Sequence, residues 1–196
     1  ELPHIVRNTL GVLELAGRTD TEVAAGRDAP IARPLRIADD THGPTGLGYA
    51  VLPSPARGPG PRDAADLIVA EARARPGELT LVTLGPLSNV AVALEHEPEL
   101  PRLLRRRVMM VGAYRSPGNT APTMEWNAGV DPEALAATIR GWAATDAPRP
   151  IAFAFATGPC RRWRPTGRGR ARLGVPPSGR VATDRCVRRR PAPRRR

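Results

Sequence analysis

The stretch Met110 to Ala134, MVGAYRSPGNTAPTMEWNAGVDPEA, decides how this sequence is interpreted. It starts within an apolar run, Val108 to Val111, which predicts a buried β-strand. A loop rich in Gly, Pro and Asn follows, and it carries Asn119, Glu125 and Asn127. Three polar side chains therefore stand on a loop that leaves the end of a buried strand.

A helix is predicted to begin directly after this loop. Asp131 is suited to cap its first turn, Pro132 fits the first helical position, and Glu133 complements the helix dipole. In open α/β sheets, ligands bind in the crevice at the carboxyl ends of the strands. The loop between Val111 and Asp131 is therefore expected to face such a crevice, with Asp131 itself serving only as a cap.

The motifs of this stretch occur in the same order and spacing as those of a known family. They are Met110-Val111-Gly112, Gly118-Asn119, Glu125-Trp126-Asn127 and Asp131-Pro132-Glu133-Ala134. In this order they resemble the inosine–uridine preferring nucleoside hydrolases. The sequence departs from that pattern at Val111, where the family has glycine, and at Trp126, where it usually has phenylalanine.

Two further segments extend the resemblance over roughly residues 4 to 157. Thr41 to Gly48, with His42 and three glycines, is similar to a family loop near the active site. Gly85 to Asn89, GPLSN, is similar to the family's Gly-Pro-Leu-Thr-Asn motif. In the family, the residue before this glycine gives a backbone carbonyl to a calcium ion, so the resemblance assigns that role to Leu84. Judged without the resemblance, Gly85 and Asn89 only shape and cap a turn.

The resemblance implies a ribonucleoside N-glycosidase that hydrolyses purine or pyrimidine nucleosides to base and ribose. Asn119, Glu125 and Asn127 would then hold the ribose hydroxyls, with His42 near the substrate. Most calcium ligands and the general base would come from an aspartate cluster expected before Glu1, and a late His-Asp pair is expected after the resemblance ends. Calcium takes six to eight oxygen ligands, so we expect this chain to be inactive or nearly inactive alone, with no catalytic base of its own.

Each site residue also has a plain structural interpretation. Asparagines in Gly/Pro-rich loops commonly satisfy turn backbones, and a single glutamate is most often exposed. His42 alone would be an ordinary surface histidine. The joint spacing of Asn119, Glu125 and Asn127 is what favours substrate binding.

Alternating strands and helices predict an α/β fold: an open, mainly parallel sheet flanked by helices in three layers, incomplete relative to the family. We expect an inward helix face of Ala64, Leu67, Ile68 and Ala72, and a later one of Ala134, Leu135, Thr138, Ile139 and Trp142. The expected strands are Thr21–Ala25, Leu79–Leu84 (in the centre of the sheet), Val108–Val111 and Pro150–Ala156; the expected helices are His4–Ala16, Asp63–Ala74, one running from Ser88-Asn89 to about Glu95, Pro98–Arg106 and Pro132–Ala144.

The net charge of +11 is confined to the end of the chain. Residues 161–196 hold 14 of the 30 basic residues and one of the 19 acidic residues, so residues 1–160 carry a net charge of −2. We therefore divide the chain into a partial nucleoside hydrolase domain, residues 1–157, and an Arg/Pro/Gly-rich tail, residues 158–196, whose composition favours disorder.

Three interpretations of the tail and body stay open. The tail is out-of-frame translation of a GC-rich gene, in which case restoring the reading frame recovers downstream family motifs. Alternatively, the protein binds nucleic acid through its arginines, with steeply salt-dependent affinity. In the third interpretation, the body is a non-catalytic remnant that binds nucleosides.

The remaining sequence features concern the cysteines, the cellular location and the assembly of the protein. Cys160 and Cys186 have no metal-ligand spacing and form no disulfide framework. No apolar run approaches the length of a membrane span or signal peptide, so we expect no membrane partner and a cytoplasmic location. The resemblance implies a homo-oligomer. The preferred base is left open, because its pocket is expected largely beyond the resembling region.

Overall fold

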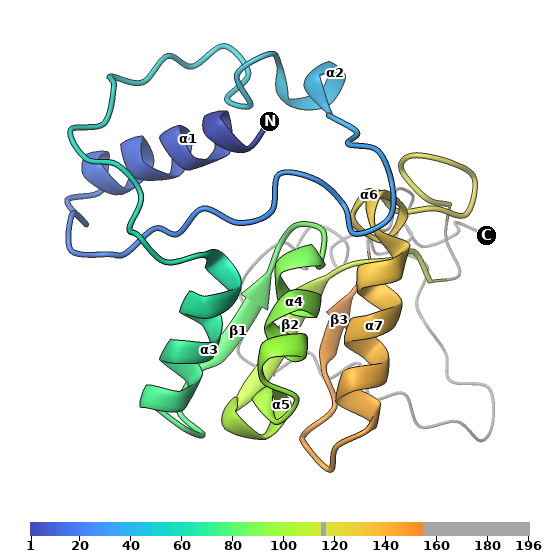
Figure 1. The fold of residues 1–196 in the computed structure, drawn as a ribbon. Helices are drawn as coiled ribbons and strands as arrows, with labels where there is room; N and C mark the ends of the chain where they lie inside the picture. The colour runs from blue at the N-terminus through green and yellow to red at the C-terminus, as the bar shows by residue number, and fades with distance from the viewer. Residues whose placement is uncertain (115–116, 155–196) are drawn as a thin grey trace, which may run out of the picture.

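The structure is a computed structural model that describes residues 1–114 and 117–154 (Figure 1). The predicted disorder of residues 158–196, the nucleic-acid hypothesis and both cysteines concern residues outside this range. The elements are α1 (Leu2–Leu15), α2 (Asp39–His42), α3 (Ala64–Ala74), β1 (Thr80–Thr83), α4 (Ser88–His96), α5 (Leu100–Leu103), β2 (Arg106–Met110), α6 (Trp126–Val130), α7 (Pro132–Ala143) and β3 (Ile151–Phe153).

The described strands form one parallel sheet in the order β1-β2-β3. Thr80 pairs with Arg106 and Val108 pairs with Ile151, so each strand is joined to the next through a helical crossover. The predicted α/β class with a parallel sheet is confirmed. The central position expected for Leu79–Leu84 is not found among the described strands, because β1 pairs with β2 alone and lies at an edge.

The described helices α3, α4 and α7 lie on one face of the sheet, in front of it in Figure 1. Apolar side chains from α3, α4, α5 and α7, including Trp142, form one core cluster. A second cluster joins α4, β2 and the start of α7 around Leu87 and Met109. On the opposite face, Val82 and Phe153 are about half exposed, at 55% and 52%. The described core is therefore built on one side of the sheet.

The predicted cap at Asp131 is confirmed, and the helix expected from Asp63 is also capped by that residue. The Asp63 carboxylate accepts a hydrogen bond from the Ala65 amide at 2.7 Å, and Asp131 accepts one from the Ala134 amide at 3.0 Å. The expected inward face of α3 was partly wrong: Ala65, Val69 and Ala72 are the buried residues, and Ile68 only packs against the cluster. The run Leu67 to Ala70 is apolar on every side, so its spacing does not select one face.

The inward face of α7 is mostly as expected. Ala134, Thr138 and Trp142 are buried, and Leu135 packs against the second cluster. Ile139 is 49% exposed, so its inclusion was wrong. Ile139 follows Thr138 directly, so its side chain lies beside the buried face of α7 and not on it.

The first 60 residues contain helix and loop but no described strand. The strand expected at Thr21–Ala25 was wrong: only Ala25 forms a single bridge, with Asp63. α1 lies apart from the sheet in Figure 1 and packs on the segment around Leu52, which a side chain at Gly11 would approach within 3.3 Å. Within residues 1–114 and 117–154, no helix is long and apolar enough to span a membrane.

Candidate functional site

Glu125 is the buried anchor of the loop that follows β2. Its side chain is 1% exposed, and its carboxylate caps the short helix α6 by accepting from the amides of Asn127 and Ala128 at 2.8 and 3.0 Å. It also accepts from the amide of Gly112, at the end of β2, at 2.8 Å. The exposed interpretation of this glutamate was wrong. In this geometry Glu125 holds α6 against the strand end, and its contact with a sugar hydroxyl stays a prediction.

Asn127 joins the carboxyl ends of β1 and β2. Its Nδ2 donates to the carbonyl oxygen of Met110 at 2.9 Å and to that of Leu84 at 3.2 Å. The residue is 6% exposed, and among the described residues its carboxamide oxygen receives no hydrogen bond. Asn127 therefore fixes the carbonyl that the sequence analysis assigned to calcium, and it retains an acceptor at the same place.

Asn119 lies on the exposed part of the loop and is tied back to α6. Its Oδ1 accepts from the amide of Trp126 at 2.9 Å and from the Thr120 hydroxyl at 3.3 Å. Its Nδ2 has no hydrogen bond within the described part of the chain, so it is available to an incoming acceptor. The structure thus brings Asn119, Glu125, Asn127 and the Leu84 carbonyl together at one edge of the sheet.

His42 is not part of this group. It is exposed at the end of α2, which Figure 1 places at the top of the molecule, away from α6. The loop around it does need glycine, since Gly43, Gly46 and Gly48 all have positive φ, between 62° and 80°. The substrate role of His42 stays a prediction.

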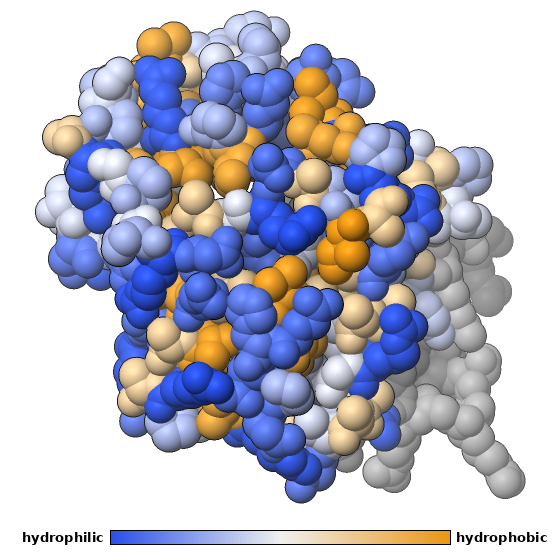
Figure 2. Space-filling view, viewed as in Figure 1, coloured by the Kyte–Doolittle hydropathy of each residue, from blue (hydrophilic) through white to orange (hydrophobic). Residues whose placement is uncertain are grey.

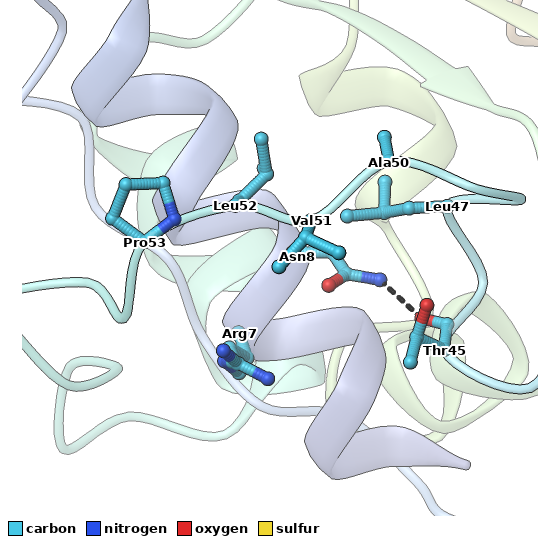
Figure 3. A pocket seen from close by; sticks show the side chains of 8 residues that line it. All are labelled: Arg7, Asn8, Thr45, Leu47, Ala50, Val51, Leu52 and Pro53. Carbon is cyan, nitrogen blue, oxygen red and sulfur yellow. Dashed lines mark hydrogen bonds between the residues drawn. The ribbon is translucent and has the colours of Figure 1, made fainter.

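A hollow near this loop is too small for a nucleoside. It has a volume of about 50 Å³ and lies between α1 and residues 45–53, where Asn8 Nδ2 donates to the Thr45 carbonyl at 2.6 Å (Figure 3). Pockets for small molecules usually have roughly 300 Å³ or more. We therefore assign this hollow to the packing of α1 on the loop.

The sequence analysis did not predict the contacts of a segment that crosses the carboxyl end of the sheet. Residues 26–37, here called the strap, contact α4, α6 and α7. The Ile31 amide donates to Asp131 at 3.0 Å, the Arg27 amide donates to Asn89 Oδ1 at 2.8 Å, and the Arg36 guanidinium lies 5.3 Å from the centre of the Trp126 ring. These contacts join residues 60 to 100 positions apart, so no local sequence pattern reveals them.

An ion pair adds to these contacts at the surface. Arg33 donates to both carboxylate oxygens of Glu133 at 2.8 to 3.1 Å. These hydrogen bonds hold the pKa of Glu133 below its ordinary value and raise that of Arg33. Both groups are exposed, so the pair orients the strap more than it stabilises the fold.

The described residues do not by themselves form a calcium site. Calcium needs six to eight oxygen donors, and no group of three or more His, Cys, Asp or Glu side chains suited to a metal occurs within residues 1–114 and 117–154. The Leu84 carbonyl is one donor of the required kind, but it accepts from Asn127 here. One carbonyl and a neighbouring carboxamide oxygen do not satisfy this ion.

Comparison with known proteins agrees with the grouping at this sheet edge. A sequence model of the family described as inosine-uridine preferring nucleoside hydrolase matches residues 1–158. The chain belongs to this family. Membership accounts for the motif order, and the family generally implies a metal cofactor. The substitutions at Val111 and Trp126 are tolerated: Val111 is buried in the second core cluster, and Trp126 stacks with Arg36.

Named relatives come from bacteria and plants. A pyrimidine-specific ribonucleoside hydrolase, RihA, from Shewanella woodyi is 43% identical over 129 residues, which are 66% of this chain and 41% of that protein. A probable uridine nucleosidase 2 from Arabidopsis thaliana is 42% identical over 130 residues, 65% of this chain and 40% of the relative. This nucleoside hydrolase chain therefore spans about two-fifths of the length of these relatives.

Solved structures give the same fold. A plant nucleoside hydrolase, PpNRh1, matches with a TM-score of 0.72 at 33% identity and covers 78% of this chain and 47% of that one. A purine-preferring ribonucleoside hydrolase from Gardnerella vaginalis matches with a TM-score of 0.68 at 27% identity, covering 71% and 45%. The described fold is thus part of a nucleoside hydrolase fold. The Gardnerella vaginalis protein is described as purine-preferring and RihA as pyrimidine-specific, so the likeness does not select the base.

Proposed function

We propose that this chain is part of a ribonucleoside N-glycosidase and contributes the sugar-binding edge of its site. The observation that carries the proposal is the arrangement of Asn127. One carboxamide fixes the carbonyls at the ends of β1 and β2, while its own oxygen receives no hydrogen bond from the residues that the structure describes. A free acceptor held at the carboxyl ends of two parallel strands suits recognition of a ligand hydroxyl.

The chemistry of the reaction explains why such groups are useful. Breaking an N-glycosidic bond passes through an oxocarbenium-like transition state, so the ribose becomes electron-poor. Asn127 would accept from one ribose hydroxyl, and the free Nδ2 of Asn119 would donate to another. Glu125 places a negative charge behind them and keeps α6 in position. These groups bind and orient the sugar; none of them is a general base.

The finer properties are proposals carried by family membership. The metal is calcium, with the Leu84 carbonyl as one ligand and the other ligands supplied from outside the described residues. The protein forms a homo-oligomer. It acts in the cytoplasm, in nucleoside salvage. The boundary between a domain at residues 1–157 and a tail at 158–196 is likewise proposed. The family-model match, which ends at residue 158, supports that boundary.

A chimera tests the proposed function. Replacing the aligned 129 residues of the Shewanella woodyi relative by those of this chain is expected to give an enzyme that releases ribose from uridine, whereas the 196-residue chain alone shows no turnover at enzyme-like rates. Asn127→Leu in the chimera should lower kcat/KM by about 100-fold, since hydroxyl recognition by a polar site discriminates strongly. Arg106→Met, on an exposed strand position, is the matched control.

Two results would contradict the proposal. One is a folded chimera that neither binds nor cleaves a ribonucleoside. The other is Asn127→Leu retaining full activity in a chimera that does cleave. Ribose release is measured by a reducing-sugar assay, and folding is checked by circular dichroism.

A further inference from the structure

The strap is attached to the sheet edge mainly through one buried carboxylate. Asp131 is 0% exposed, and its Oδ1 caps α7 through the Ala134 amide. Its Oδ2 accepts from the Ser88 hydroxyl at 2.5 Å and from the Ile31 amide at 3.0 Å. A helix cap needs only the first of these contacts. The other two join the start of α4 and the strap to the same side chain.

We propose that Asp131 is a positioning residue that fixes the strap over the sugar-binding edge. Hydrogen bonds to a buried carboxylate are stronger than those between neutral groups, and an amide left unpaired in this place is costly. Ile31 lies 100 residues from Asp131, so the bond closes a long stretch of chain. The Arg33–Glu133 pair beside it is exposed and contributes less.

The strap contacts α4 at one end and α6, next to the candidate site, at the other. At one end, Gly26 lies so close to α4 that an added Cβ would come within 2.4 Å of the Asn89 side chain, which holds the Arg27 amide. At the other end, Arg36 stacks on Trp126, the residue between Glu125 and Asn127. Loosening Asp131 would therefore free the segment that lies against the Asn127 helix.

This inference rests on the proposed function for its effect on nucleosides, but its structural part can be tested separately. The first measurement is hydrogen–deuterium exchange of the 196-residue chain, comparing wild type with Asp131→Asn. Asparagine keeps the shape and one carbonyl oxygen for the α7 cap, while its amide cannot accept from Ile31. Exchange of the Ile31 amide should be about tenfold faster, whereas residues 135–143 should change little.

Two other variants test whether the effect of Asp131→Asn comes from its contact with the strap. Ser88→Ala removes a different partner of the same carboxylate and should leave exchange of the strap near the wild-type rate. Gly26→Ala disturbs the contact with Asn89 but keeps Asp131 intact, so exchange of the Ile31 amide should stay near the wild-type rate. Unchanged exchange of this amide in a folded Asp131→Asn would overturn the proposal. If Asp131→Asn does not fold, the wild-type chain decides the question, because an Ile31 amide that exchanges as fast as an unprotected amide would show that Asp131 does not hold the strap.

The second measurement is the affinity for inosine, which is expected to fall about tenfold in Asp131→Asn and to stay near wild type in Ser88→Ala. If wild type binds inosine and Asp131→Asn binds it equally well despite a loosened strap, the positioning role is wrong. If neither this chain nor the chimera binds a nucleoside, the proposed function fails, while the exchange data still decide whether Asp131 holds the strap.

Discussion

Replacing Arg107 by methionine is expected to raise the free energy of unfolding by about 1–4 kcal/mol, the range found when buried charged groups give way to apolar ones. The Arg107 side chain is 1% exposed on the helix-covered face of β2. None of its guanidinium nitrogens has a hydrogen bond among the described residues, and its only specific contact is with the Trp142 ring, 4.5 Å from the ring centre. A cation–π contact of about 0.5–2 kcal/mol offsets only part of the cost of desolvation.

The difference in stability between Arg107→Met and wild type should depend on pH in a defined direction. Burial lowers the pKa of Arg107 to about 10, below its ordinary value, because desolvation disfavours the charged form. Above that pH the folded state loses the proton while the unfolded state keeps it, so the stability of wild type rises relative to Arg107→Met. The advantage of methionine should therefore be largest near pH 7 and shrink as the pH rises through 10.

Urea denaturation of the two proteins provides the measurement. Arg106→Met is the matched control, since Arg106 is exposed and should change stability by no more than about 0.5 kcal/mol. A less stable Arg107→Met protein would show that the guanidinium is satisfied in solution, against this description of the core.

Removing the Glu125 carboxylate should have the opposite effect on stability. Glu125→Ala leaves the amides of Gly112, Asn127 and Ala128 without their acceptor inside the protein. Hydrogen bonds to charged groups contribute roughly 1.5–3 kcal/mol each and are not additive, so we expect a net loss of about 2–5 kcal/mol. α6 should lose its fixed position, and with it the hold of Asn127 on the Leu84 carbonyl.

The size of this loss is read from urea denaturation and the local effect from hydrogen exchange in residues 126–130. Glu125→Gln should fall between wild type and Glu125→Ala, because one carbonyl oxygen remains. Glu95→Ala, on the exposed side of α4, is the control and should be nearly neutral. A Glu125→Ala protein as stable as the control would mean that α6 does not depend on this cap.

The elements with strong local signals were predictable from the sequence. β2 follows from its apolar run, and α7 follows from Asp131, Pro132 and the apolar spacing up to Trp142. α6 was missed because it has only five residues and is capped by a glutamate, whereas caps are usually Ser, Thr, Asp or Asn. The Thr21–Ala25 strand failed because β propensity forms a strand only when a partner strand is available.

The sequence predicted that three of the candidate residues lie close together, but it predicted neither their contacts nor the separate position of His42. Motif spacing grouped Asn119, Glu125 and Asn127, and the family resemblance added the Leu84 carbonyl, but neither showed that Glu125 is buried beneath backbone amides. The burial of Arg107 was also missed, because a charged residue before an apolar run is usually exposed. Alternation along the strand, counted back two residues from buried Met109, was the available signal.

Apolar side chains are exposed on α1 and on the loop that follows α2. Figure 2 shows orange patches in the upper part of the view, in the region of α1 and the loop after α2. Ile5, Val12 and Leu15 of α1 are 50–68% exposed, and Tyr49 and Val51 of the loop are more exposed still.

The central claim, that Asn127 and its neighbours bind ribose, is tested most directly by nuclear magnetic resonance of the Asn127 side-chain amide during nucleoside titration. We predict a saturable shift with inosine and a much weaker one with 2′-deoxyinosine, because a missing hydroxyl leaves a polar partner unpaired. Equal shifts with both nucleosides, or no shift with either one, would contradict the account.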